Sequence, residues 1–184
     1  MRRNAPSGGV NGGGGDGGTV NHGRTLAREA ALDNQPPSTQ NVHAMNIHAS
    51  CAARDGMGVL LTGPAGSGKS DLLLRLLSRG FLLVADDRVD IIGLCARAPA
   101  ALAGLLEIRG LGIVRIPHVA EAQLVLAVDL TAQVVRMPIP ARHSTLDLPL
   151  IRLDPAQASA PDKIVMALDC ALGRTTQIAG AFAA

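Results

Sequence analysis

The sequence predicts an α/β fold, a P-loop-containing nucleotide-binding domain built on a mixed β-sheet. Residues 63–70 read GPAGSGKS and match the phosphate-binding pattern G-x-x-x-x-G-K-[ST]. The short apolar run 57–62 before them is typical of a buried strand, and the leucine-rich run 71–79 after them is typical of a helix that ends at Gly80. A P-loop connects a strand to a helix in this order, so the three observations support one another.

The residues of this loop suit phosphate binding. Glycines allow backbone N–H groups to turn toward a phosphate, and the start of a helix adds unpaired donors and partial positive charge. We expect Lys69 to reach the outer phosphates of a nucleotide and the Ser70 hydroxyl to bind Mg²⁺. A glycine-rich turn that binds nothing is the alternative, and the complete motif in its usual context argues against it. The predicted nucleotide-binding residues are Gly63, Pro64, Ala65, Gly66, Ser67, Gly68, Lys69 and Ser70.

Composition divides the chain of 184 residues into one domain and two tails. Residues 1–41 are rich in glycine and carry few large apolar side chains, so we expect a flexible tail there, or a true start further on, near Met45. The folded domain is placed at 42–176, and 177–184 is expected to form a C-terminal tail.

Charge, hydropathy and cysteine usage exclude several classes of partner. The net charge of +2 is too small to indicate nucleic acid, and no apolar run approaches the roughly 20 residues needed to span a bilayer. Cys51, Cys95 and Cys170 are odd in number and lack C-x-x-C spacing. This pattern is typical of reduced cysteines in a cytoplasmic protein.

The remaining elements follow from apolar runs and turn residues. The turn 54–56 makes residues 46–53 an antiparallel partner of the P-loop strand, and 81–85 fits a central strand. The other expected elements are a short helix or turn at 99–106, a strand or loop at 107–116, strands at 123–130, 134–137 and 150–153, and a loop at 138–149. A last helix is expected at 162–172, with Pro161 at its N1 position and Gly173 as its stop.

Several polar residues are candidates for chemistry. Asp86 and Asp87 follow the strand 81–85, and ligands bind at the carboxyl ends of strands in such sheets. One carboxylate is suited to a metal ion held through water and the other to accepting a proton; a polar turn is the alternative. Glu107 and Arg109 share one face of a strand, where a surface ion pair is the simpler interpretation. His48, taken alone, is more typical of a structural histidine.

Taken together, these motifs resemble one family. His48, the P-loop, the string LVADD at 83–87 and the string EIRGLGI at 107–113 are similar to the HPr kinase/phosphorylase catalytic domain, in its short alphaproteobacterial form. The resemblance covers about residues 46–172, and EIRGLGI is its most specific part. It implies a fold of the HPr kinase / phosphoenolpyruvate carboxykinase-like kind.

The resemblance also implies an activity. The family uses ATP and Mg²⁺ to phosphorylate a serine of the phosphocarrier protein HPr, and many members reverse the reaction by phosphorolysis; a cytoplasmic hexamer is expected. The roles it implies are proton acceptor for Asp87, a place beside the metal for Asp86, active-site residues for His48 and Lys69, Mg²⁺ ligands for Ser70 and Glu107, part of the signature loop for Arg109, and a catalytic arginine for Arg136.

One segment departs from the family pattern. Longer members carry the string PVRPGR before the last helix, and this string is tied to dephosphorylation. Residues 153–158 read LDPAQA here, without either arginine. We therefore expect kinase activity with slow phosphorolysis. A P-loop small-molecule kinase and a nucleotide-sensing module that acts on a partner protein remain the alternative functions.

Overall fold

The computed structural model describes residues 44–183, so the expected tail 1–41 lies outside the described part. The strands are β1 (Ala44–Ile47), β2 (Ser50–Arg54), β3 (Met57–Thr62), β4 (Leu82–Ala85), β5 (Val89–Ile92), β6 (Cys95–Arg97), β7 (Leu105–Ile108), β8 (Gly112–Arg115), β9 (Glu121–Leu130) and β10 (Leu150–Leu153). The helices are α1 (Lys69–Leu77), α2 (Ala160–Ala171) and a 3₁₀ turn, η1 (Ala100–Leu102). Neither α-helix is long and apolar enough to cross a membrane.

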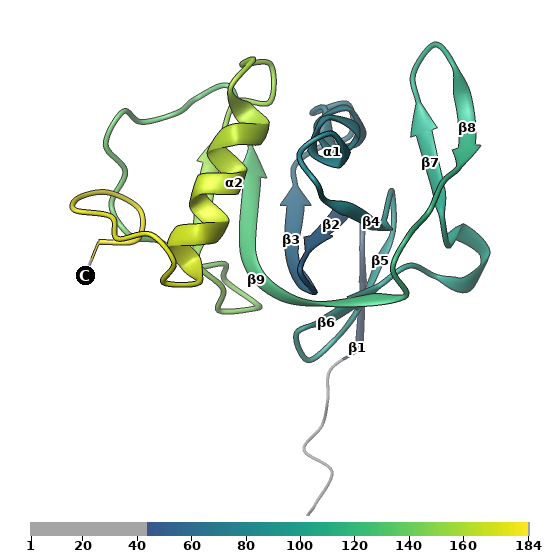
Figure 1. Ribbon diagram of the computed structural model, residues 1–184, viewed down its shortest axis with the longest axis horizontal. Coiled ribbons are helices and arrows are strands. Elements are labelled where there is room, and N and C mark those ends of the chain that lie inside the picture. The colour runs from purple at the N-terminus through teal and green to yellow at the C-terminus, as the bar shows by residue number, and fades with distance from the viewer. Residues whose placement is uncertain (1–43, 184) are drawn as a thin grey trace, which may run out of the picture. The chain divides into compact units, whose positions relative to one another are not determined.

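Eight of the strands form one mixed sheet in the order β1-β5-β6-β9-β3-β2-β4, with β10 paired to β9 beyond this path (Figure 1). β3 and β10 run parallel to β9, and the other pairs are antiparallel. The predicted α/β class with a mixed sheet is therefore confirmed. Strand β9 is the longest and pairs with β3 over the whole length of β3, so it holds the P-loop strand in the middle of the sheet.

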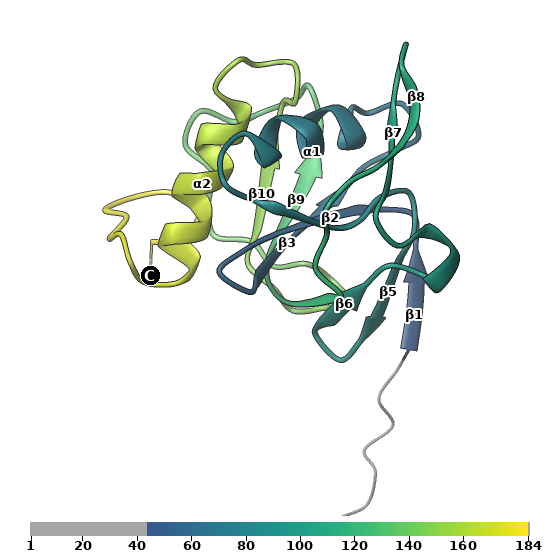
Figure 2. The same ribbon diagram turned by 45° about the vertical axis from the view of Figure 1, so that its right-hand side comes forward.

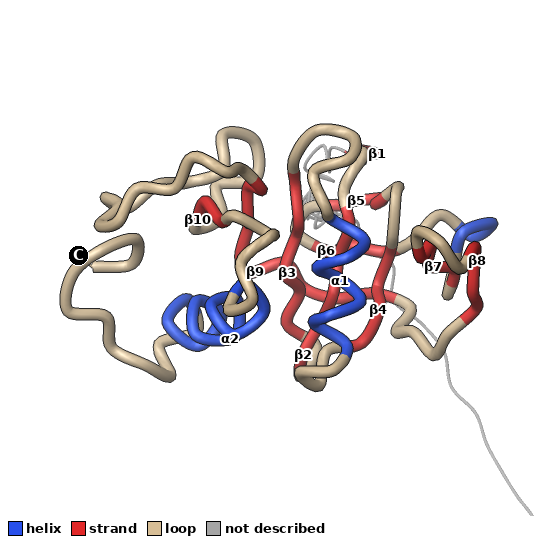
Figure 3. Tube along the Cα trace, turned by 90° about the horizontal axis from the view of Figure 1, so that it is seen from above, coloured by secondary structure: helices blue, strands red, loops and turns tan. Residues whose placement is uncertain are grey.

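The sheet is buried on both faces, which explains its nearly continuous apolar strands. Along β3, Val59 and Leu61 face the core beneath the helices, whereas Leu60 faces a second core on the opposite side. Helix α1 packs on β2 and β4, and α2 packs on β9 (Figure 3). The P-loop therefore connects two elements, β3 and α1, that both pack in the core.

The strand next to the P-loop strand is shorter than predicted. Of the segment 46–53, residues from Ser50 onward pair antiparallel with β3 as β2, whereas Ala44–Ile47 pairs with β5 instead. His48 falls in the connection between β1 and β2. The chain passes at this point from pairing with β5 to pairing with β3, so His48 lies in a connection and not within a strand.

Two further expectations were wrong. The run 81–85 is not central: β4 lies at the end of the strand order, and a single bridge from Leu83 to His118 lies on its outer side. The run is apolar because Phe81 and Leu83 pack in the core beneath the helices, while Val84 and Ala85 pack in the core on the opposite face. Residues 134–137 form no strand but part of a loop, in which Val135 and Met137 are exposed and gain nothing from a sheet.

Two peripheral segments complete the described part. β7 and β8 form a separate two-stranded hairpin beside the sheet (Figure 2). Residues 177–183, expected as a tail, fold back: Ala181 is buried and Phe182 packs on the core beneath the helices.

Candidate active site

A cleft of about 440 Å³ opens beside the P-loop. It brings together residues from four parts of the chain: the connection before β2, the P-loop with the start of α1, the residues after β4, and hairpin strand β7. Its lining residues are His48, Ser50, Ala65, Gly66, Gly68, Lys69, Ser70, Asp71, Leu74, Asp86, Asp87, Glu107, Ile108 and Arg109. A volume of this size suits a nucleotide-sized ligand.

The P-loop has the backbone that its glycines predict. Gly68 is the N-cap of α1 with a φ of 88°, in the left-handed region that a side chain disfavours. A Cβ on Gly63 would lie 2.8 Å from the Ser67 Oγ and 3.3 Å from the Leu130 carbonyl oxygen, so no larger residue fits there. The loop is thus held tightly between β3, β9 and α1.

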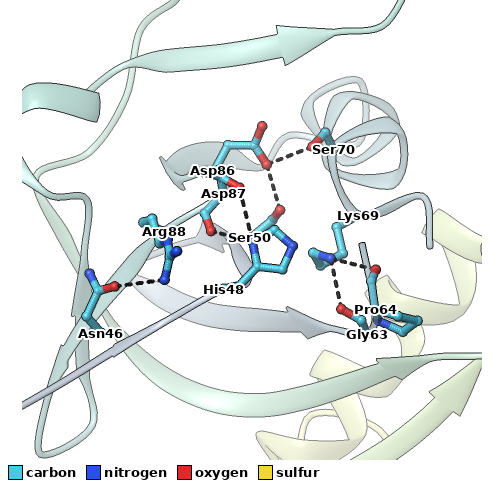
Figure 4. A network of polar contacts seen from close by, with 10 residues as sticks. All are labelled: Asn46, His48, Ser50, Gly63, Pro64, Lys69, Ser70, Asp86, Asp87 and Arg88. Carbon is cyan, nitrogen blue, oxygen red and sulfur yellow. Dashed lines mark hydrogen bonds and ion pairs between the residues drawn. The ribbon is translucent and has the colours of Figure 1, made fainter. Parts of the chain in front are cut away.

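Lys69 is the buried cation of the site. Only 6% of the residue is exposed, and its Nζ donates hydrogen bonds to the carbonyl oxygens of Gly63, at 2.9 Å, and Pro64, at 3.0 Å (Figure 4). Burial lowers the pKa of Lys69, and the negative charges of Asp86 and Asp87 oppose that shift. The ammonium group is therefore placed within the phosphate loop.

Asp86 is the buried carboxylate, with 4% of the residue exposed. Its Oδ1 accepts two hydrogen bonds, one from the Ser50 Oγ at 2.6 Å and one from the Ser70 Oγ at 3.0 Å (Figure 4). The contact to Ser70 joins the end of β4 to the P-loop. Asp86 therefore lies where it can help to orient the hydroxyl group expected to bind Mg²⁺.

Asp87 points into the opening of the cleft. Its side chain is 66% exposed, and the His48 Nδ1 lies 3.0 Å from its Oδ1 and 2.9 Å from its backbone oxygen. Both oxygens are acceptors, so Nδ1 carries the proton in these contacts. Asp87 also has a φ of 67°, which is uncommon for a residue other than glycine and is typical of functional sites. His48 thus holds an accessible carboxylate in a strained backbone position.

The hairpin supplies the opposite wall. Glu107 and Arg109 both line the cleft, Glu107 from β7 and Arg109 from the turn that follows it, so the two do not share a strand face as predicted. The turn between β7 and β8 requires Gly110 at a φ of 84° and Gly112 at a φ of 115°, and the Leu111 N–H closes it with a 2.9 Å bond to the Ile108 oxygen. The two glycines of EIRGLGI therefore shape a turn that keeps its charged residues beside the phosphate loop.

Most predicted site residues line this cleft. Gly63, Pro64 and Ser67 belong to the P-loop but are not among the lining residues, and Arg136 lies outside both. Arg136 is exposed in the loop after β9 and is not among the lining residues. Sequence reasoning missed Ser50, which is buried against Asp86. The available signal was a lone hydroxyl in an apolar strand two residues after His48.

The donor set fits Mg²⁺. Among residues 44–183, no cluster of three or more His, Cys, Asp or Glu side chains forms a complete cage. Mg²⁺ does not need one, because it is usually held by one or two carboxylates together with substrate phosphates and water. The Ser70 hydroxyl with the Asp86 and Glu107 carboxylates provides such hard oxygen donors in the cleft.

Comparison with known proteins identifies the family. The family model "HPr Serine kinase C-terminal domain" matches residues 40–147. The chain belongs to the HPr serine kinase family. It is 38% identical over 137 residues to the HPr kinase/phosphorylases of Burkholderia cenocepacia and Paraburkholderia phymatum, covering 65% of this chain and 42% of each relative. The chain thus spans less than half the length of these curated relatives.

A solved structure agrees with this assignment. The HPr(Ser) kinase/phosphatase of Coxiella burnetii superposes with a TM-score of 0.60 at 27% identity, covering 71% of this chain and 98% of the other. The family model ends before residues 153–158, the segment in which a departure from the HPr kinase pattern is expected from the sequence. This segment lies against the phosphate loop, because a Cβ on Gly68 would lie 3.4 Å from the Pro155 Cγ.

Proposed function

We propose that this protein is an ATP-dependent protein-serine kinase acting on the phosphocarrier protein HPr. One observation carries the proposal: an exposed carboxylate, Asp87, is held by His48 in the same cleft as the P-loop residues Lys69 and Ser70. Phosphoryl transfer requires a positioned nucleotide, neutralised charge and an acceptor for the hydroxyl proton. This cleft holds a residue suited to each task.

The residues divide these tasks by position. The P-loop backbone and Lys69 would hold the phosphates of ATP, while Ser70, Asp86 and Glu107 would hold Mg²⁺. The chemistry that Mg²⁺ would supply there is neutralisation of charge on the phosphates. Asp87 accepts the proton of the incoming seryl hydroxyl, and Arg109 adds positive charge from the opposite wall.

The exposure of Asp87 favours a protein as the acceptor. A serine on a folded protein reaches an active-site carboxylate only where that carboxylate lies open to a large partner. Asp87 is mostly exposed at the opening, whereas Asp86 beside it is buried. The two adjacent carboxylates therefore suit different roles, base and metal partner.

Substitution of each carboxylate tests this division. Asp87→Asn is expected to keep Mg²⁺–ATP binding and to lose serine phosphorylation by ~10²–10⁴-fold, as when a general base is removed. Asp86→Asn should instead raise the Mg²⁺ concentration needed for half-maximal rate. Transfer of labelled phosphate from ATP to purified HPr measures both. Asp162→Asn on α2, outside the cleft, is the matched control and should leave the rate unchanged. Full kinase activity in Asp87→Asn would overturn the assignment of the base.

We also propose that the reverse reaction is slow. Residues 153–158 lie against the P-loop but carry no arginine or lysine that could bind a second phosphate. Seryl-phosphorylated HPr, incubated with the enzyme, Mg²⁺ and inorganic phosphate, should release pyrophosphate much more slowly than the kinase reaction proceeds. Equal rates in the two directions would show that the arginine string is not needed.

The resemblance to the family supports two further proposals. The protein is a cytoplasmic enzyme, and it assembles into a homo-oligomer, with six copies expected. Light scattering of the purified chain checks the assembly; a monomer at micromolar concentration would contradict it.

A further inference from the structure

Ser50 belongs to a small buried polar network. Among residues 44–183, the buried polar or charged residues are Ser50, Lys69 and Asp86, and all three line the cleft. Ser50 is fully buried, and the bond from its Oγ to the Asp86 Oδ1 is, at 2.6 Å, the shorter of the two that this oxygen accepts. A buried hydroxyl is costly unless it is hydrogen-bonded, so this contact accounts for its presence.

Packing alone does not call for a hydroxyl at this position. Ser50 is followed in β2 by the small apolar residues Cys51, Ala52 and Ala53, all of them buried. An apolar side chain would fill the same place in the sheet. The strand register also brings Ser50 to Asp86: Cys51 pairs with Ala85, and the pairing then shifts by a bulge. Bulges beside active sites commonly re-aim a side chain.

The network shows why a second donor to Asp86 is useful. Asp86 also accepts a bond from Ser70, the hydroxyl expected to bind Mg²⁺. If Ser70 were the only donor to Asp86, the carboxylate group could rotate once the Ser70 hydroxyl turned to another partner. Ser50 is on β2 and Ser70 is on α1, so the bond from Ser50 to Asp86 does not depend on the position of the P-loop helix. The carboxylate therefore remains oriented while the site loads.

We propose that Ser50 is a positioning residue for metal-dependent nucleotide binding, acting through Asp86; the proposal rests on the kinase function above. The Ser50 hydroxyl fixes the Oδ1 of Asp86, so that the other carboxylate oxygen keeps one direction. Residues that orient the partners of a metal in this way commonly change metal affinity or activity by about 10–100-fold when removed.

A matched pair of variants isolates the hydroxyl. Thr and Val have nearly the same shape, so Ser50→Thr and Ser50→Val place the same extra bulk in the sheet and differ only in the donor. Equilibrium binding of a fluorescent ATP analogue is measured across a Mg²⁺ titration, together with binding of the same analogue without Mg²⁺. Ser78→Ala, at the exposed C-cap of α1, is the control and should match the parent.

Ser50→Val is expected to raise the Mg²⁺ concentration for half-maximal binding by about 10–100-fold, with metal-free binding unchanged. Ser50→Thr should stay close to the parent. The effect of Ser50→Val should also vanish when Asp86 is replaced by alanine, because the two residues act as one unit. If Ser50→Val fails to fold in a melting experiment, Ser50→Ala removes the same donor without added bulk.

Three results would overturn the proposal: equal behaviour of the Thr and Val variants, loss of metal-free binding as well, or an undiminished effect without Asp86. The readout does not depend on HPr. If the parent fails to phosphorylate HPr while the Mg²⁺ shift appears, the acceptor is wrong and the role of Ser50 is supported. If HPr is phosphorylated and no shift appears, the role of Ser50 is wrong and the kinase proposal stands.

Discussion

At the scale of single residues, the site pairs buried charges with exposed ones. Lys69 and Asp86 are buried, while Asp87 beside them is open to solvent. A buried lysine is costly because its charge leaves water, and burial accordingly lowers the pKa of Lys69. The carbonyl oxygens of Gly63 and Pro64 offset part of that cost. The P-loop thus holds the Lys69 ammonium group in a position suited to an anionic ligand.

We expect Lys69→Ala to abolish nucleotide binding or turnover while the domain remains folded, and the shape-matched Lys69→Met to behave alike. Folding lowers the pKa of Lys69, so the charged lysine destabilises the fold at every pH below its folded-state pKa. The stability of the fold recovers as the pH rises from that pKa toward the ordinary value of 10.5. Lys69→Met should therefore melt no lower than the parent at neutral pH, and any gain should shrink at alkaline pH. Scanning calorimetry at neutral and alkaline pH measures the melting temperatures, and titration with ATP measures nucleotide affinity. Unchanged ATP affinity and rate would remove Lys69 from the mechanism.

At the scale of elements, one arginine joins the P-loop helix to the loop after β10. Arg75 in the last turn of α1 donates to the carbonyl oxygens of Pro155 at 2.7 Å, Gln157 at 2.7 Å and Ala158 at 3.1 Å. Pro155 in turn contacts the P-loop at Gly68. Residues 155–158 are thus held against the phosphate loop by a residue outside that segment.

Arg75→Ala is expected to lower the free energy of unfolding by about 1–3 kcal/mol, the usual effect of losing hydrogen bonds from a charged donor. Arg79→Ala is the control one turn later on the same segment. Arg79 pairs with Asp162 on the surface, with both side chains about half exposed, and such pairs contribute about 0–1 kcal/mol. Urea unfolding of both variants makes the comparison. Equal losses would show that the three carbonyl contacts add nothing beyond a surface ion pair.

At the scale of the whole molecule, stability resides in the two apolar cores on either side of the sheet. Deleting residues 1–41 should leave the melting temperature and the kinase rate unchanged, because their composition offers almost nothing to bury. Thermal melting and HPr phosphorylation of the truncated chain provide the test. A loss of about 1 kcal/mol or more would mean that this segment docks on the domain.

Local patterns were enough for several elements. The strand before the P-loop, the helix after it and the strand at 150–153 are all present. The last helix is present too, and it begins at Ala160, one residue before Pro161. These features depend on glycines, a proline and apolar periodicity within short stretches. The edge position of β4 and the loop at 134–137 were not predicted, because an apolar run shows that a segment is covered and not what covers it.

The sequence by itself determined the phosphate loop, the carboxylate pair and the family, because each depends on residues close together in the chain whose order directs the backbone. Only the tertiary structure decided how the carboxylates differ. Ser50 and Ser70 are 36 and 16 residues from Asp86, and they meet it through the pairing of β2 with β4 and the packing of α1. Strand register depends on the whole sheet, and a bulge at Cys51 shifts it locally. That register leaves Asp86 buried between two hydroxyls and Asp87 open to solvent.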